Sequence, residues 1–318
     1  MAVATSWRGL VGIPILILLL AGPVGPAADG ERVAAGPTGP TTAATVTPAP
    51  AAPTPVSAPT AAAGIWQPPV VAGWQWQIDG TPLDLGPAQR GETIIYNIDY
   101  EYYSSDDVAR LHALGQRVWC YVPIGVYESY RPDAAQFPAD VIGGPTGWPD
   151  EFYLDIRRFD AFASIIEARF DLCRAKGFDG IEGDYQNNLA DDTVSPWAGQ
   201  ITLAQQEAFN QWFIAAAHER GLSAGLKNAP EHAGRWAQWP DAVHPHGYDW
   251  ALNEQCFEFD ECQDGPHQGY SAFVNSGRPV FQVEYNLPAD RFCARANALN
   301  FNSLVKRPAL DPYREPCR

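Results

Sequence analysis

The chain has 318 residues, with 37 acidic and 21 basic side chains and a formal net charge of −16. This surplus argues against a nucleic-acid partner, because the phosphates of a nucleic acid would be repelled. It suits a cationic ligand, although the solubility of a secreted protein explains the same charge equally well.

The first 63 residues are expected to lie outside the folded domain. Residues 1–28 have the pattern of a secretory signal peptide, with Arg8, an apolar stretch over Leu10–Ala21 and small residues after it. That stretch is shorter than the roughly 20 residues of a membrane span. We therefore expect secretion and no stable membrane partner, with an uncleaved anchor at the cell surface as the alternative. Residues 29–63 are mostly Ala, Pro, Thr and Gly, which predicts a disordered linker.

Strands and helices are predicted to alternate over residues 64–318, which is close to the roughly 250 residues of a barrel domain. The predicted strands are 74–78, 93–98, 117–122, 178–182, 222–226, 250–253, 279–283 and 299–305. Predicted helices begin near Ser105, Asp160, Thr202 and Gly234, and Thr202 with Gln205 predicts a capping box. A long loop is expected over 123–158, and loops of this length are usually functional. Eight strands with intervening helices predict an α/β protein with a single-domain (β/α)8 TIM-type barrel, which we expect to be a monomer.

Six cysteines behind a signal sequence favour disulfides. We expect Cys256–Cys262 to close a loop, Cys293–Cys317 to pin the C-terminus, and Cys120–Cys173 to tie a strand to a helix. The sequence has no Cys-x-x-Cys unit, and His244-x-His246 lacks an accompanying ligand motif. We therefore expect no metal and no cofactor.

Acidic side chains stand at the ends of several predicted strands. Glu182 and Asp184 are two residues apart, so in a strand they point the same way, toward the mouth of the barrel. A salt-bridged strand end is the alternative for this pair. Glu254 leaves the sixth strand beside Cys256, and its alternative is an exposed loop acid next to a disulfide. Paired carboxylates are the groups that glycoside hydrolysis uses.

Polar and aromatic residues near these acids are candidates for binding a sugar. Lys227 and Asn228 end the fifth strand, where a lysine keeps neighbouring acids ionised and an asparagine bonds a hydroxyl. Asp79, Asn253 and Glu284 are expected to contribute to the same binding set. Flat rings for sugar stacking are offered by Tyr100, Tyr102, Tyr103, Tyr121, Tyr127, Tyr185 and Trp148, although each ring alone is more often a packing residue.

Several segments in combination resemble the endo-α-1,4-polygalactosaminidase family, glycoside hydrolase family 114. The resemblance spans about residues 66–306 and is carried by Trp74–Gly80, Cys120-Tyr121 with Gly125, Glu128, Arg131 and Asp133, Arg169–Asp171, Lys176–Asp184, Ala217-His218 with Gly221-Leu222, Gly225–Asn228, Asn253–Cys256 with Cys262, and Val280–Tyr285.

This resemblance implies a (β/α) barrel that hydrolyses α-1,4-linked galactosamine polymers, including partly N-acetylated ones. It implies that Asp184 and Glu254 are the catalytic pair, with Asp184 as nucleophile in a retaining mechanism and Glu254 as general acid/base. A deacetylated polymer is cationic, which agrees with the negative charge of the chain. Two alternatives remain open: a non-catalytic polysaccharide-binding barrel, and a hydrolase of another α-linked amino sugar or galactoside.

Overall fold

The computed structural model describes residues 64–189, 197, 199–263 and 268–318. The predicted signal peptide (1–28) and linker (29–63) lie outside these residues. The described part belongs to one compact unit. Within that part, no helix is both long and apolar enough to cross a membrane.

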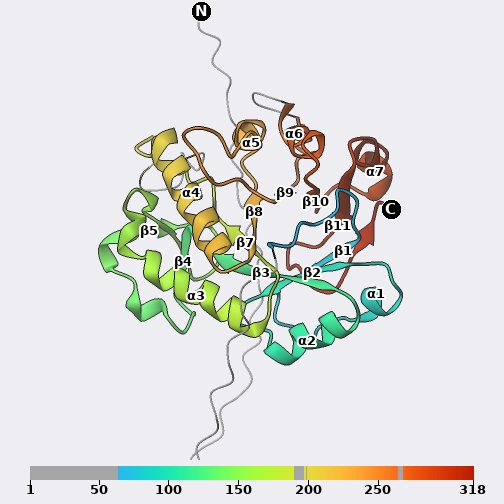
Figure 1. Cartoon of the computed structure of the whole chain (residues 1–318), viewed down its shortest axis with the longest axis horizontal. Helices are drawn as coiled ribbons and strands as arrows, with labels where there is room; N and C mark the ends of the chain where they lie inside the picture. The colour runs from blue at the N-terminus through green and yellow to red at the C-terminus, as the bar shows by residue number, and fades with distance from the viewer. Residues whose placement is uncertain (1–63, 190–196, 198, 264–267) are drawn as a thin grey trace, which may run out of the picture. The chain divides into compact units, whose positions relative to one another are not determined.

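Eight parallel strands form the centre of the molecule and pair in chain order around a curled sheet (Figure 1). They are β1 (Trp74–Gln77), β2 (Ile95–Asp99), β3 (Arg117–Pro123), β7 (Gly180–Asp184), β8 (Ser223–Lys227), β9 (Trp250–Glu254), β10 (Val280–Glu284) and β11 (Phe301–Val305). A short strand, β12 (Glu315–Pro316), pairs antiparallel with β11. The predicted TIM-type barrel is confirmed, and all eight predicted strands are present with bounds shifted by up to two residues at each end.

In the described part of the chain, backbone hydrogen bonds link each pair of neighbouring strands from β1 to β11 but do not link β11 back to β1. Side chains join these two strands instead. The indole of Trp74 donates to the Asn302 carbonyl at 2.9 Å, and the Asn302 side chain accepts from the backbone N–H of Ala72 at 2.9 Å. The buried Lys306 ammonium donates to Gln75 Oε1 at 3.2 Å. Burial lowers the pKa of Lys306 to about 7.

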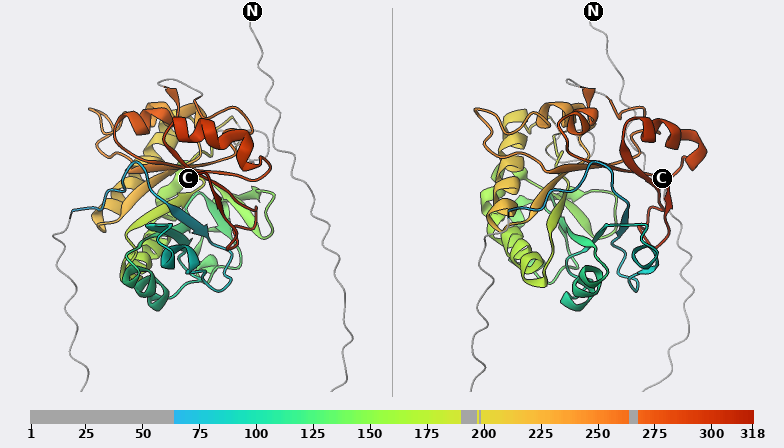
Figure 2. Two further views of the ribbon diagram at one scale, coloured as in Figure 1. Left: turned by 90° about the vertical axis from the view of Figure 1, so that its right-hand side faces the viewer. Right: turned by 45° about the vertical axis from the view of Figure 1, so that its right-hand side comes forward.

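Helices cover the outer face of the sheet (Figure 2). They are α1 (Gly86–Gln89), α2 (Ser105–Ala113), α3 (Ala163–Lys176), α4 (Leu203–Glu219), α5 (Pro230–Trp236), α6 (Ser271–Asn275) and α7 (Ala289–Ala298). The capping box predicted at α4 is confirmed, because Thr202 accepts from Gln205 N while Gln205 accepts from Thr202 N. At α2 the cap is Ser104, one residue before the predicted one.

The predicted long loop over 123–158 is a small antiparallel sheet with short 3₁₀ turns. Its strands β4 (Val126–Glu128), β5 (Ile142–Pro145) and β6 (Glu151–Leu154) pair in the order β4-β6-β5. The turns are η1 (Ala134–Gln136), η2 (Ala139–Val141) and η3 (Ile156–Ala161). The strands are only three or four residues long, so their alternation is too brief to be recognised in the sequence. This segment stands at the C-terminal end of β3, beside the mouth of the barrel.

Two apolar clusters occupy the two faces of the curled sheet. The larger cluster lies between strands and helices, and the smaller one takes the alternate strand positions that face inward. Inside, Trp119 stacks on Trp250 with ring centroids 3.8 Å apart. A Cβ at Gly225 would lie 2.3 Å from the Trp250 ring, so only glycine fits beneath this stack. Large rings therefore fill the barrel interior and leave the strand ends for polar groups.

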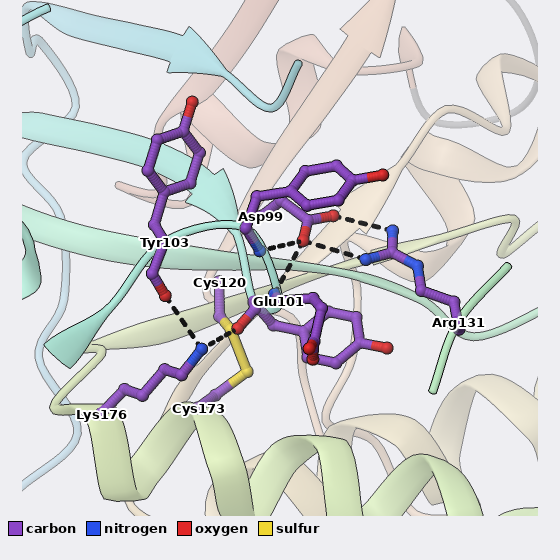
Figure 3. Close-up of a disulfide and its surroundings, with 9 residues drawn as sticks. Asp99, Glu101, Tyr103, Cys120, Arg131, Cys173 and Lys176 are labelled. Atoms are coloured by element: carbon purple, nitrogen blue, oxygen red, sulfur yellow. Dashed lines mark hydrogen bonds and ion pairs between the residues drawn. A yellow bond between two sulfur atoms is a disulfide. The ribbon is translucent and has the colours of Figure 1, made fainter. Parts of the chain in front are cut away.

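All three predicted disulfides are present: Cys120–Cys173, Cys256–Cys262 and Cys293–Cys317. The first of them ties β3 to α3 (Figure 3). The second closes the loop that begins directly after β9, which fixes the chain next to Glu254.

Candidate active site

Three charged side chains end three neighbouring strands. Asp184 is the last residue of β7, Lys227 of β8 and Glu254 of β9, and these strands are adjacent in the sheet. Parallel strands end at the same rim, so the three side chains meet at the C-terminal mouth of the barrel, where active sites of this architecture lie.

Lys227 is the centre of this cluster. Its ammonium lies 2.8 Å from Asp184 Oδ1, 3.1 Å from Glu254 Oε2 and 3.4 Å from Glu182 Oε1. The Trp76 ring lies below it, with the ring centroid 5.0 Å from Nζ. Burial alone lowers the pKa of Lys227, but the carboxylates outweigh burial and raise that pKa well above its ordinary value. The lysine is therefore a fixed cation shared by the acids.

Asp184 is held by donors on both of its oxygens. The Tyr121 hydroxyl donates to Oδ2 at 2.9 Å, and Lys227 donates to Oδ1 at 2.8 Å. The backbone N–H of Tyr185 also donates to Oδ1, at 3.0 Å. Tyr185 adopts the left-handed conformation, with φ of 61°, which turns the chain sharply after β7. These contacts fix the direction in which the carboxylate faces.

Glu254 is held by a different set of groups and is more exposed. Its Oε1 accepts from the Tyr285 hydroxyl, and its Oε2 accepts from the Asn228 side-chain amide at 3.0 Å. Asn228 Oδ1 in turn accepts from the Glu254 backbone N–H at 2.9 Å, so one asparagine fixes both backbone and side chain. The Glu254 side chain is 25% exposed and that of Asp184 14%, which leaves both within reach of a ligand.

Glu182 lies beneath the cluster and is fully buried. Its Oε2 accepts from the Asn97 amide, and its Oε1 faces Lys227. Burial raises the pKa of Glu182 to about 8, even though Lys227 acts in the opposite direction. At neutral pH this acid mostly keeps its proton, so Lys227 balances chiefly Asp184 and Glu254.

The structure therefore brings together Asp184, Glu254, Glu182, Lys227, Asn228 and Tyr121, and it places the other three predicted residues elsewhere. Asp79 Oδ1 accepts from the Thr81 backbone at 3.1 Å and the Thr81 hydroxyl at 2.8 Å, which is a local turn contact. Asn253 is 1% exposed, and its side chain alternates with that of Glu254 along β9. The predicted sugar contacts of these two residues stay predictions.

Glu284 has a structural position rather than an open one. It is fully buried, and its Oε1 accepts from the Phe257 backbone N–H at 2.8 Å and from the Gln282 amide at 2.7 Å. Burial raises the pKa of Glu284 to about 7. In this position Glu284 holds the loop that follows Glu254, and its predicted contact with a sugar stays a prediction.

Three residues of the site were not singled out from the sequence: Tyr285, Asn97 and Trp76. Phe281 and Val283 face the inside of the barrel, and Tyr285 follows at the next alternate position after β10. This alternation in the sequence could have predicted that Tyr285 faces inward. Asn97 lies mid-strand between two apolar residues and Trp76 between two glutamines, and only the closure of the barrel shows that Asn97 faces Glu182 and Trp76 faces Lys227.

The separation of the two carboxylates indicates their chemistry. Because one ammonium contacts both, the nearest oxygens of Asp184 and Glu254 are at most about 6 Å apart. Retaining glycosidases have carboxyl groups about 5–5.5 Å apart, while inverting ones need about 6.5–9.5 Å to admit a water. Two carboxylates this close to each other fit a two-carboxylate glycoside hydrolase site. Over the described ranges, no group of three or more His, Cys, Asp or Glu is arranged to hold a metal ion.

Comparisons with known proteins identify the family of the chain. Ega3 of Aspergillus fumigatus, whose structure was solved as a complex with galactosamine, is 29% identical with a TM-score of 0.68, covering 80% of this chain and 99% of that chain. The glycoside hydrolase domain of PelA from Pseudomonas aeruginosa shares the fold at 14% identity and a TM-score of 0.53, covering 78% of this chain and 98% of that chain. Among curated proteins, none matches the sequence. The model of glycoside-hydrolase family GH114 matches residues 56–318. The chain therefore belongs to glycoside-hydrolase family GH114 and is a glycoside hydrolase.

Proposed function

We propose that the protein is a secreted enzyme that cleaves α-1,4-linked galactosamine and N-acetylgalactosamine polymers within the chain, by a retaining two-carboxylate mechanism. The observation that carries the proposal is the contact of one lysine with both acids, 2.8 Å from Asp184 and 3.1 Å from Glu254. Family membership and the galactosamine bound to the similar Ega3 support an aminosugar substrate.

Asp184 is assigned as the nucleophile and Glu254 as the acid/base. In the first step an oxygen of Asp184 bonds to the anomeric carbon, the glycosidic C–O bond breaks, and Glu254 gives its proton to the leaving oxygen. In the second step Glu254 takes a proton from water, whose oxygen bonds to the same carbon and releases the Asp184 carboxylate. The firm fixation of Asp184 by Tyr121, Lys227 and Tyr185 N suits attack along one direction.

The charge of the cluster supports these roles. With Glu182 protonated, the site holds one ammonium and two acids, and a proton on Glu254 leaves one ammonium against one carboxylate. When the glycosyl ester forms, Asp184 loses its charge, and Lys227 then faces Glu254 alone.

The negative charge of the chain supports a cationic substrate. The chain carries a formal net charge of −16, which raises the local concentration of a deacetylated polymer. Secretion is supported by the three disulfides, which persist in oxidising compartments.

The experiment is incubation with deacetylated polygalactosamine and with a partly N-acetylated polymer, followed by mass spectrometry of the products. Wild-type protein is expected to release oligomers of several lengths, whereas Asp184→Asn and Glu254→Gln lower the rate by at least about 10²–10⁴-fold. Both variants are expected to keep the wild-type circular dichroism spectrum. Full activity in either variant contradicts the assigned pair, and no product from either polymer contradicts the substrate.

A further inference from the structure

Two tyrosines beside the mouth of the barrel keep half of their surface in water. Tyr102 follows β2 and is 49% exposed, and Tyr130 follows β4 and is 50% exposed. The guanidinium carbon of Arg131 lies 5.3 Å from the centre of each of the two rings. One cation therefore fixes both rings, and we call Tyr102, Tyr130 and Arg131 the tyrosine platform.

Arg131 is anchored in the protein by two carboxylates. Its side chain is 2% exposed and forms a two-point ion pair with Asp99, with N–O distances of 3.0 and 2.8 Å (Figure 3). Its Nε donates to Glu128 at 2.6 Å, and the other oxygen of Glu128 accepts from the Tyr130 hydroxyl. Buried ion pairs of this kind add little net stability because of the desolvation cost, but they fix geometry well.

The loop that carries Tyr102 is fixed from below as well. Asp99 Oδ1 accepts from the Tyr102 backbone N–H at 3.1 Å. The Lys176 ammonium, on α3, donates to the carbonyls of Tyr100 at 2.6 Å and Tyr103 at 2.9 Å (Figure 3). The ring of Tyr102 is therefore held in place before any ligand arrives, which lowers the entropic cost of binding.

The strand β3 connects the tyrosine platform to the active site. Asp99 and Tyr121 are register partners on β2 and β3, and neighbouring strands lie about 4.8 Å apart. The Tyr121 hydroxyl bonds Asp184 directly, so a single residue of β3 separates the anchor of the platform from the nucleophile. The anchor of the platform and the nucleophile thus stand at the C-terminal ends of β2 and β7, on the same side of the barrel.

The charge of the tyrosine platform favours an amino sugar. The carboxylates of Asp99 and Glu128 exceed the single cation of Arg131 by one negative charge. A sugar presents an apolar C–H face that stacks on an aromatic ring, and an ammonium group is attracted by both the ring and the excess charge. A neutral sugar gains only the stacking contribution.

We propose that the tyrosine platform is a second sugar-binding site, which holds a galactosamine residue of the same polymer that is cut between Asp184 and Glu254. This rests on the proposed function for the identity of the polymer. The site serves binding and processing of long chains and takes no part in the bond cleavage.

The test measures binding of deacetylated polygalactosamine by calorimetry, with the full chain carrying Glu254→Gln so that the polymer stays intact. Adding Tyr102→Ala or Tyr130→Ala is expected to weaken binding roughly fivefold each. Tyr102→Phe keeps the ring and is expected to bind as the Glu254→Gln parent does. Tyr313→Ala is the matched control, since Tyr313 stacks with Arg307 at 4.5 Å on the segment after β11. We expect it to leave the affinity unchanged.

Unchanged affinity in both alanine variants overturns the proposal, as does a parent that fails to bind the polymer. If an alanine variant does not fold, Tyr102→Leu and Tyr130→Leu keep apolar packing without a ring, and parent-like affinity in these overturns it too. Ring-dependent binding in a wild-type chain that releases no oligomers would support the platform while contradicting the proposed reaction.

Discussion

Replacing Lys227 by methionine tests whether this lysine offsets the charges of Asp184 and Glu254. At an effective dielectric constant of about 20, a charge pair about 3 Å apart is worth about 5 kcal/mol by Coulomb's law, and desolvation offsets much of this. Losing one partner of a buried pair costs about 3–5 kcal/mol. Asp184 and Glu254 keep side-chain exposures of 14% and 25%, so water relieves part of that cost. We expect a loss of about 3 kcal/mol in the free energy of unfolding.

The assay is urea unfolding at pH 7 together with the thermal midpoint, which should fall by roughly 9 °C for a domain of this size. Lys306→Met is the matched control, because Lys306 is equally buried but contacts Gln75 and a carbonyl instead of carboxylates. Removing its two hydrogen bonds also removes a desolvation cost, so we expect a change of about 1 kcal/mol or less. Activity should fall with Lys227→Met and persist with Lys306→Met.

Adding Asp184→Asn to Lys227→Met separates charge from packing. If the destabilisation comes from an unpaired carboxylate, neutralising Asp184 restores part of the stability, with a coupling energy of about 1 kcal/mol or more. Equal unfolding free energies for wild type and Lys227→Met, or no coupling in the double variant, would show that Lys227 does not offset the charge of Asp184.

Three further predictions follow from single contacts. Tyr285→Phe removes the hydroxyl that bonds Glu254 and is expected to lower kcat about tenfold with a smaller effect on KM, measured by steady-state kinetics on the polymer. Burial raises the pKa of Glu284 to about 7, so the folded state keeps a proton that the unfolded state releases near pH 4.5. The protonated carboxyl therefore contributes to the free energy of unfolding at low pH, and this contribution is lost as the pH rises through about 7. Glu284→Gln should therefore flatten the decline of unfolding free energy between about pH 5 and 7 by up to about 3 kcal/mol, and an unaltered slope would contradict the assignment. Gly225→Ala places a Cβ against the Trp250 ring and should lower the free energy of unfolding in urea by about 1–3 kcal/mol. An unchanged free energy of unfolding would show that the tryptophan stack shifts to make room for the methyl group.

The barrel was predictable because local signals agreed along most of the chain. Thr202 and Gln205 form the predicted capping box, and Gly177 adopts the left-handed conformation that ends α3 before β7. The strand β7 was predicted to begin at Phe178, but it begins at Gly180, and Phe178 and Asp179 belong to the connection between α3 and β7. Asp179 lies just before β7, at the end of the barrel opposite the mouth, and its side chain accepts from the Val118 backbone N–H at 2.9 Å.

The site was only partly predictable, because a strand-end acid has several possible partners. Asp184 and Glu254 remain near solvent and share Lys227, whereas Glu284 turns into the protein and bonds Phe257 N. Asp99 shows the same limit, since its charge is matched by Arg131, which lies 32 residues away in the chain. Sequence spacing shows that these acids end strands, and tertiary contacts decide which of them stay open to a ligand.

The stereochemistry of the first product distinguishes a retaining from an inverting pair of carboxylates. Proton NMR recorded during early hydrolysis of deacetylated polygalactosamine distinguishes the anomers of the newly formed reducing end. Because one lysine holds the two carboxylates close together, we expect the α-anomer to appear first and then to equilibrate with the β-anomer. Initial appearance of the β-anomer, or the absence of any product, would contradict the claim that Asp184 and Glu254 form a retaining pair.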